Sequence, residues 1–352
     1  MKRLLLVLTA TVLAFSASAA TPKRKSAPKA SAKKVAVAKA PAKSAAPVET
    51  AHRKTPYVGA ISVDAATGRV LFEDHADAEA YPASVTKLMT LLLVMEDVKA
   101  GKYGYDDKVE ATADAYHSIA SWVGIKTGEK MTVRDLCMAL MVDSANDAAM
   151  VLSVHAAGSW QKFVVRMNER AKALGMMHTS YFCSNGLPPN PVDDATKRVK
   201  PMPWKGVNVS TARDQMILAR QLVRMPEVMS LTSIKTCDLV KTSDGYRVAV
   251  TRRTNEPTVE TQPAEGEKIV KQMRNHNNVM RMDKLKIINP DGKEAVDGLK
   301  TGYIDAGGSS VVLTGARKGK RAIVVVLGSS SAKERDAQAQ RLMNDALGSL
   351  AW

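Results

Sequence analysis

Hydrophobic residues follow two different spacings along this chain. Near both ends of the folded part they form short apolar or alternating runs, which are typical of β-strands. Such runs lie at 57–63, 69–72, 307–316 and 321–328. In the middle they recur every three or four residues behind capping side chains, which predicts helices. These helices are expected near 84–95, 132–142, 144–152, 160–174 and 211–224, with a closing amphipathic helix at 329–350.

This order of elements predicts an α+β fold. Two terminal hairpins, the second turning at 317–320, are expected to share one antiparallel sheet with the closing helix on one face. The middle of the chain, about 84–226, is expected to form a helical lobe. We interpret 231–270, which carries Thr, Val and charge, as short strands or an exposed insert. A cleft between the sheet and the lobe is the expected place for a site.

Residues 1–19 have the three parts of a secretory signal peptide. Met1–Arg3 is positively charged, Leu4–Phe15 is apolar, and Ala17–Ala19 is a small-residue cleavage pattern. The apolar run is short for a membrane span, so we predict export, with an uncleaved anchor as the alternative. After cleavage the protein is expected to be periplasmic or extracytoplasmic, without a transmembrane anchor.

Residues 20–55 are almost all Ala, Lys, Pro, Ser and Val, and a packed core cannot form from this composition. We predict a disordered basic tether ahead of one folded domain at 56–352. The tether either contacts an anionic wall or membrane surface or is a soluble spacer. Residues 1–56 carry twelve Lys/Arg and one acid, a net +11 of the total +16, which leaves +5 for the rest. A folded part this mildly basic is not expected to bind nucleic acid.

The three cysteines are too few for a disulfide framework. Cys137 lies in an apolar helical pattern and is expected to be a buried free thiol. Cys183 and Cys237 could pair, but nothing in the sequence requires it. The six histidines show no ligand spacing such as His-Glu-x-x-His, so we expect no metal and no cofactor.

Ser84 and Lys87 place a hydroxyl and an amine three residues apart, just before the apolar run 88–95. In a helix the two side chains would share one face. A serine becomes a useful nucleophile when a base lies beside it. A lysine can be that base if burial or a second cation lowers its pKa. The alternative is an ordinary helix start with a solvated lysine.

Two further short motifs follow in the chain. Ser144-Ala145-Asn146 begins a predicted helix, and Lys300-Thr301-Gly302 lies just before the C-terminal hairpin. Each is weak alone, because a serine is a common N-cap and Lys-Thr-Gly fits a strand boundary. The order Ser-x-x-Lys, Ser-x-Asn, Lys-Thr-Gly is much harder to obtain by accident, and a similar triple marks penicillin-binding proteins and class A β-lactamases.

With these motifs the chain resembles the serine D,D-peptidases, and most closely the low-molecular-weight D-alanyl-D-alanine carboxypeptidases. The resemblance runs from about residue 57 to the C-terminus. It extends to the surroundings of the motifs, at 142–149, 173–176, 184–187 and 296–303. It implies a β-lactamase/D,D-peptidase-like fold, in which N- and C-terminal helices cover the sheet and the active site lies between sheet and helical lobe. The implied partners are peptidoglycan stem peptides, with β-lactam antibiotics as covalent inhibitors.

The resemblance also implies catalytic roles. Ser84 would attack the carbonyl of a D-Ala-D-Ala bond and form an acyl-enzyme, and Lys87 would take its proton. Lys300 would keep Lys87 neutral and attract an anionic substrate. Ser144 would relay a proton to the leaving amine, and water would then release the acyl group.

Further residues are implied in substrate binding. Asn146 would bind the substrate amide, and Thr301 the terminal carboxylate or its β-lactam equivalent. Gly302 would let the substrate strand approach the edge strand. The backbone N–H groups of Ser84 and Tyr303 would form an oxyanion hole.

This chain departs from the family pattern in two places. Ala145 replaces the usual central glycine of the second motif, which leaves the flanking side chains intact. His276 lies where the family often has an arginine for the substrate carboxylate. Arg335, at the start of the last helix, resembles another carboxylate ligand of the family and would compensate for this change.

Three other functions stay in view. The histidine leaves room for the endopeptidase branch, which cleaves peptidoglycan crosslinks with the same residues. A class A β-lactamase is disfavoured, because the segment 184–191 contains no acid that could activate a deacylating water. A non-catalytic wall-binding protein would keep the fold and use its basic tether.

Overall fold

The computed structural model describes residues 55–113, 121–187 and 206–350. The predicted signal peptide and all of the predicted tether except residue 55 lie outside this part of the chain, so both remain predictions. No helix among the described residues is long and apolar enough to cross a bilayer.

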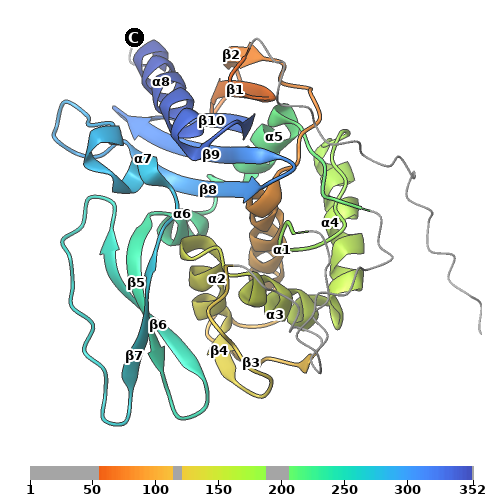
Figure 1. Ribbon diagram of the computed structural model, residues 1–352, viewed down its shortest axis with the longest axis vertical. Helices are drawn as coiled ribbons and strands as arrows, with labels where there is room; N and C mark the ends of the chain where they lie inside the picture. The colour runs from red at the N-terminus through yellow and green to blue at the C-terminus, as the bar shows by residue number, and fades with distance from the viewer. Residues whose placement is uncertain (1–54, 114–120, 188–205, 351–352) are drawn as a thin grey trace, which may run out of the picture. The chain divides into compact units, whose positions relative to one another are not determined.

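The predicted central sheet is confirmed, with five antiparallel strands in the order β2-β1-β10-β9-β8 (Figure 1). The N-terminal hairpin pairs with the C-terminal one through β1 and β10. One strand, β8, was not predicted as a strand, and it forms an edge of the sheet. The bounds are β1 Gly59–Asp64, β2 Val70–Asp74, β8 Val296–Ile304, β9 Gly308–Arg317 and β10 Lys320–Ser329.

Both faces of this sheet are buried, which explains the continuous apolar runs in its strands. Along β10, Ile323 and Val325 point into a core shared with the helical lobe. Val324 and Val326 point the other way, into a second core under α8 (Ala332–Leu350). The closing helix therefore covers one face, as predicted, and α5 (Ala212–Leu222) lies against the other (Figure 1).

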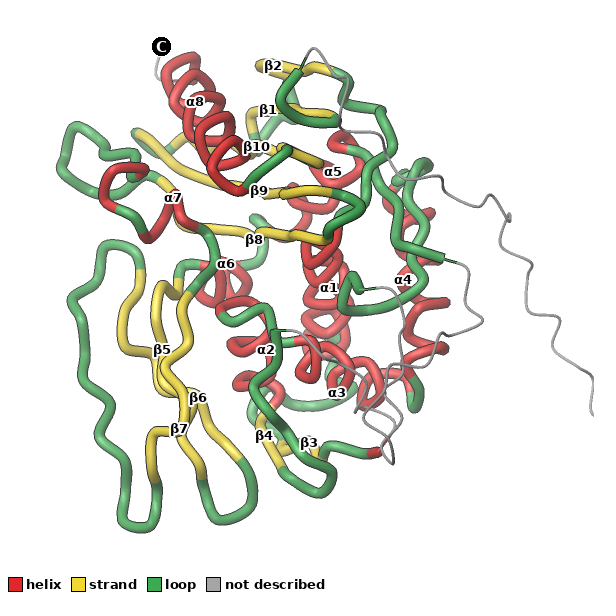
Figure 2. Tube along the Cα trace, viewed as in Figure 1, coloured by secondary structure: helices red, strands yellow, loops and turns green. Residues whose placement is uncertain are grey.

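The middle of the chain is largely helical (Figure 2). Its elements are η1 Ala83–Thr86, α1 Lys87–Lys99, β3 Lys108–Glu110, β4 Lys130–Thr132, α2 Val133–Val142, α3 Asn146–Ala157, α4 Trp160–Leu174 and α6 Pro226–Thr232. The start predicted at 132 and the end predicted at 174 are confirmed, since the Thr132 hydroxyl accepts the Asp135 N–H at the start of α2 and Gly175, with φ +81°, ends α4. The helix predicted near 144–152 begins at Asn146 with Ala145 as its N-cap, so Ser144, the expected capping residue at its start, does not cap it.

The segment after α6 forms a second antiparallel sheet in the order β6-β5-β7. Its strands are β5 Ile234–Lys241, β6 Tyr246–Arg253 and β7 Lys268–Arg274. A long loop, 254–267, joins β6 to β7 (Figure 2). Two short helical turns, α7 Asn278–Arg281 and η3 Asp283–Leu285, then lead to β8.

Candidate active site

The Ser84 hydroxyl and the Lys87 amine lie in contact, but not within one α-helix. Ser84 belongs to the 3-10 turn η1, and Lys87 is the first residue of α1. A 3-10 helix has three residues per turn, so side chains three apart are aligned. The Lys87 Nζ lies 2.8 Å from the Ser84 Oγ. The two side chains therefore share one face, as the sequence predicts, although a 3-10 turn and not an α-helix aligns them.

Lys87 is fully buried among neutral oxygen atoms. Its Nζ lies 2.7 Å from the Asn146 Oδ1 and 2.7 Å from the Asn185 carbonyl oxygen. Burial lowers the pKa of Lys87 well below its usual value, and the charge of Lys300 lowers it further. A neutral amine has two N–H groups and one lone pair. The two oxygens can accept the N–H groups, which leaves the lone pair for the Ser84 proton.

Lys300, Thr301 and Gly302 lie within the edge strand β8, not at a strand boundary. Lys300 is 2% exposed and donates a hydrogen bond to the Thr301 carbonyl at 2.9 Å. Burial lowers its pKa to about 7, with a further contribution from Arg335. A carboxylate bound nearby would raise this pKa again, because an opposite charge favours the protonated form.

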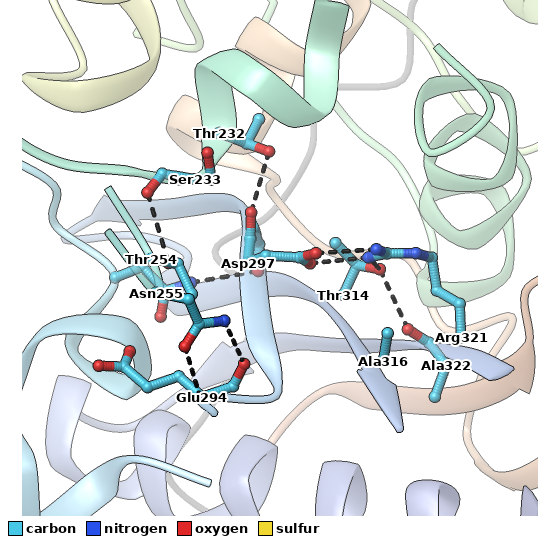
Figure 3. Close-up of polar contacts among 12 residues, drawn as sticks. Thr232, Ser233, Thr254, Asn255, Glu294, Asp297, Thr314, Ala316, Arg321 and Ala322 are labelled. Atoms are coloured by element: carbon cyan, nitrogen blue, oxygen red, sulfur yellow. Dashed lines mark hydrogen bonds and ion pairs between the residues drawn. The ribbon is translucent and has the colours of Figure 1, made fainter. Parts of the chain in front are cut away.

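Polar contacts hold β8 in place (Figure 3). The Asp297 carboxylate accepts two hydrogen bonds from Arg321, at 2.7 and 2.8 Å. The Asp297 carbonyl accepts one from the Thr232 hydroxyl at 3.2 Å. The Gly298 carbonyl accepts one from the Asn277 side chain at 3.3 Å. The strand with Lys300 is therefore tied both to its own sheet and to α6.

Two glycines from distant parts of the chain press against the η1 turn. A Cβ on Gly302 would lie 2.5 Å from the Pro82 oxygen and 3.1 Å from the Ser84 nitrogen. A Cβ on Gly186, whose φ is +89°, would lie 1.9 Å from the Ala83 oxygen. Contacts this close exclude any side chain. The sequence analysis attributed Gly302 to substrate approach, and the structure adds a reason within the protein itself.

Ser144 is 3% exposed and has φ 58°, in the left-handed region. A non-glycine residue there costs about 1–3 kcal/mol and often marks a functional site. Asn146, two residues on, reaches Lys87. The second motif thus contributes to the surroundings of the Ser84–Lys87 pair, although Ser144 does not cap the helix.

Arg335 and Tyr303 differ in exposure. Arg335 is 5% exposed, and its Nε and Nη2 donate to the Asp336 carboxylate at 2.8 and 2.6 Å. It lies close enough to Lys300 to lower the pKa of that amine. The Tyr303 side chain is largely exposed and donates to the Asp305 carboxylate at 2.7 Å, so only its backbone is a candidate for the site.

His276 lies near the two lysines of the site. Desolvation, together with the charges of Lys300 and Lys87, lowers its pKa to about 4, although part of the residue is exposed. The imidazole is therefore neutral near pH 7. Where the family often has a permanent cation, this chain presents an uncharged ring.

Sequence reasoning missed several supporting residues. The Asn185 carbonyl contacts Lys87, and its only signal was the Ser184–Leu187 surroundings. The Asp147 carboxylate, directly after the second motif, accepts the backbone N–H groups of 123–125. Asp143, directly before that motif, forms an ion pair with Lys271 of β7 at 2.6 Å. These contacts brace the segment that contains Ser144 from both sides.

All three cysteines are buried and free. This confirms the prediction for Cys137, and Cys183 and Cys237 do not pair. Within the described ranges, no group of three or more His, Cys, Asp or Glu is placed to hold a metal ion.

The comparisons with known proteins agree with this geometry. The family model of D-alanyl-D-alanine carboxypeptidases, peptidase S11, matches residues 49–331, and the chain belongs to this family. The chain is 29% identical over 287 residues to D-alanyl-D-alanine carboxypeptidase DacF of Bacillus subtilis (strain 168), covering 81% of this chain and 60% of that protein. It is 28% identical over 164 residues to the D-alanyl-D-alanine endopeptidase of Escherichia coli (strain K12), covering 45% of this chain and 51% of that protein.

Solved structures confirm the predicted fold class. The carboxypeptidase DacD of Francisella tularensis has a TM-score of 0.67 at 26% identity, with 87% of this chain and 74% of that chain covered. Penicillin-binding protein D2 of Listeria monocytogenes, in its cefotaxime-bound form, has a TM-score of 0.60 at 26% identity, with 84% and 98% covered. The chain spans about 60% of the length of DacF and of the next curated carboxypeptidases it matches.

Proposed function

We propose that this protein is a serine D,D-carboxypeptidase that removes the terminal D-alanine from peptidoglycan stem peptides, and that β-lactams acylate the same serine. The observation that carries the proposal is the 2.8 Å contact between the Ser84 Oγ and the fully buried Lys87 amine, whose other contacts are neutral oxygens. Membership of the D-alanyl-D-alanine carboxypeptidase family supports the substrate class.

In the first half of the reaction, Lys87 takes the Ser84 proton while the Oγ attacks the carbonyl of the last peptide bond. The Ser84 and Tyr303 backbone N–H groups stabilise the resulting oxyanion. The bond to the leaving nitrogen then breaks, Ser144 relays a proton to that nitrogen, and free D-alanine departs. In the second half, water attacks the ester on Ser84, which releases the shortened peptide and restores the hydroxyl.

Substrate binding uses the edge strand and its surroundings. Lys300, charged when a carboxylate is bound nearby, and Thr301 bind the terminal carboxylate, with Arg335 behind them. Asn146 binds the substrate amide while holding Lys87. Gly302 keeps β8 close to the η1 turn, so that the oxyanion donors and the nucleophile face the same carbonyl carbon.

The site of action that fits this substrate is outside the cytoplasm. The signal-peptide pattern at 1–19 supports export to the periplasm or another extracytoplasmic space. The basic composition of 20–55 supports contact with anionic wall polymer or membrane phosphates, and a soluble spacer is the alternative to be tested beside it.

The second candidate function is a D,D-endopeptidase that cleaves crosslinks. Its supporting observation is the neutral His276 near Lys300. A neutral ring contributes less to binding a terminal carboxylate than a guanidinium does, and a crosslink lacks that free end. A non-catalytic wall-binding protein is the third, and it would leave the Ser84–Lys87 contact without a purpose.

Product analysis by mass spectrometry separates the three. The purified protein is incubated with a pentapeptide muropeptide and, separately, with a crosslinked dimer, with Ser84→Ala as the matched control. We expect D-alanine release from the pentapeptide, and none from the variant. Conversion of the dimer to monomers would move the assignment to the endopeptidase. No product from either substrate, and no covalent penicillin adduct, would leave the wall-binding function.

A further inference from the structure

A pocket of about 410 Å³ lies on the second sheet. Successive residues of a strand point to opposite faces. Cys237 and Met273 pack into the core shared with the helices, so their neighbours Asp238 and Gln272 point to the outer face. The segment 258–261 covers that face, held by a hydrogen bond from the Val259 N–H to the Thr251 carbonyl at 2.7 Å. The pocket lies between this segment and the strands.

Among the described residues, the charged groups that line this pocket form no ion pair. Asp238 is only 6% exposed, yet within the described ranges its carboxylate has no hydrogen bond and no ion pair. Burying an unpaired carboxylate is costly. The Thr261 hydroxyl is also buried without a partner in the same part of the chain. Glu260 and Arg274 line the pocket too, and across the described residues neither forms an ion pair.

Other ionic groups of the same sheet do form ion pairs. Arg247 pairs with Glu267 at 2.7 Å, and Lys241 pairs with Glu129. Around the pocket, two acids and one arginine form no ion pair among the described residues. A buried acid and an exposed arginine that line one pocket, neither of them in an ion pair among the described residues, are the arrangement that a ligand with both charges would complete.

This pocket is distinct from the candidate active site. Lys271 of β7 points to the opposite face of the sheet from its neighbour Gln272, and there it pairs with Asp143, next to Ser144. The sheet therefore separates the pocket from the Ser84 cleft, and none of the roles assigned above uses its residues.

We propose that this pocket binds a small zwitterion, a free amino acid or a dipeptide, with its ammonium group on Asp238 and its carboxylate on Arg274. Threonine hydroxyls and the Gln272 amide supply further hydrogen-bond partners. The presence of Arg274 and the lack of a third acidic ligand favour an organic cation over a metal ion. This inference stands independently of the proposed peptidase activity.

Titration calorimetry with the full chain tests the inference. D-alanine and D-alanyl-D-alanine are the zwitterionic probes. N-acetyl-D-alanine, which lacks the ammonium, and D-alaninamide, which lacks the carboxylate, are their matched controls. We expect binding of at least one zwitterion, and a loss of about tenfold or more in affinity for each control. Equal binding of either control, or no binding of any probe at millimolar concentration, would overturn the inference.

Asp238→Asn locates the binding to this pocket, because a dipeptide could also enter the Ser84 cleft. The variant is expected to lose about tenfold or more in affinity for the zwitterion. Glu256→Gln, which removes an exposed acid of the same loop, is expected to keep it. Unchanged affinity in Asp238→Asn would place the ligand elsewhere.

Thermal unfolding without ligand gives a second readout. Removal of an unpaired buried carboxylate is expected to leave the melting temperature of Asp238→Asn unchanged or higher. A lower melting temperature would show that Asp238 is a structural residue, and would overturn its assignment as a ligand anchor.

Discussion

Two lysines with almost no exposed surface, in two regions of the molecule, show how surroundings decide the fate of a buried amine. Lys87 at the start of α1 meets a hydroxyl, an amide oxygen and a backbone carbonyl. Lys235 of β5 meets the Glu294 carboxylate, which is shared with Lys286 at 3.1 Å. Burial lowers the pKa of both, but Glu294 acts to raise that of Lys235, and no carboxylate contacts Lys87 among the described residues.

The contacts of Glu294 connect separate segments of the chain and are structural. Its backbone N–H and carbonyl both bond to the Asn255 side chain, at 2.7 and 3.0 Å (Figure 3). The ion pair thus ties the second sheet to the segment just before β8. The comparison teaches that a carboxylate partner keeps a buried lysine charged and structural, whereas neutral partners prepare an amine that can accept a proton.

The largest expected effect is on acylation. Lys87→Met removes the proposed base while keeping a side chain of similar length. We expect the rate of labelling by a fluorescent penicillin to fall by about 10³-fold or more, because the Ser84 proton then has no acceptor. The melting temperature is expected to stay the same or rise, since a buried amine is lost. An unchanged labelling rate would show that Lys87 is not the base.

The same substitution at the lysine that has a carboxylate partner, Lys235→Met, tests the other half of the comparison. This variant leaves Glu294 with only Lys286, so we expect it to lose about 2–4 kcal/mol of unfolding free energy. Penicillin labelling of the remaining folded protein is expected to stay within about threefold of the wild type. Urea unfolding checks the first expectation. A loss of labelling without a loss of stability would contradict the structural role given to this lysine.

Lys300 gives a pH-dependent test of the same idea. Its pKa is about 7 in the folded protein, and an unfolded lysine binds its proton up to about pH 10.5. Between these values the unfolded state holds one more proton, so stability rises with pH. Lys300→Met is expected to lower this slope by about 1–2 kcal/mol per pH unit. Urea unfolding of both proteins at pH 7, 8 and 9 measures this slope. If stability depends on pH equally in the wild type and in Lys300→Met, the low pKa of Lys300 is refuted.

The smallest effect is expected from the ion pair between Asp297 of β8 and Arg321 of β10. Asp297→Asn weakens the half-buried pair with Arg321, which we expect to cost about 1 kcal/mol or less. The penicillin labelling rate is expected to change by less than about threefold, because other contacts still hold the strand. Urea unfolding and labelling are measured together. A large loss of labelling at normal stability would show that Asp297 positions Lys300.

The sequence predicted the sheet well where local signals agree. The apolar runs 307–316 and 321–328, with a charged turn between them, fit only a hairpin. The strand β8 was missed because Asp297, Lys300 and Tyr303 interrupt its apolar pattern. Two short polar side chains of β8, those of Asp297 and Thr301, are explained only by tertiary structure: Asp297 pairs with Arg321, and Thr301 is buried in the site.

The candidate site was predicted as far as side chains and their order allow. Motif order drew attention to Ser84, Lys87, Asn146 and Lys300, and the structure places the first three in contact. The Asn185 partner is a backbone carbonyl, which no residue letter reveals. The left-handed φ of Ser144 depends on the bracing of its neighbours, which no local spacing encodes.

The clamp of Gly186 and Gly302 on the η1 turn also has a consequence for biogenesis. The segment with Ser84 meets one partner about a hundred residues later in the chain and another more than two hundred residues later. Contacts of such separation form late in folding. We therefore expect the buried surroundings of Lys87 to form late, after all three segments have met, so that a newly made chain gains its reactive serine only at the end of folding.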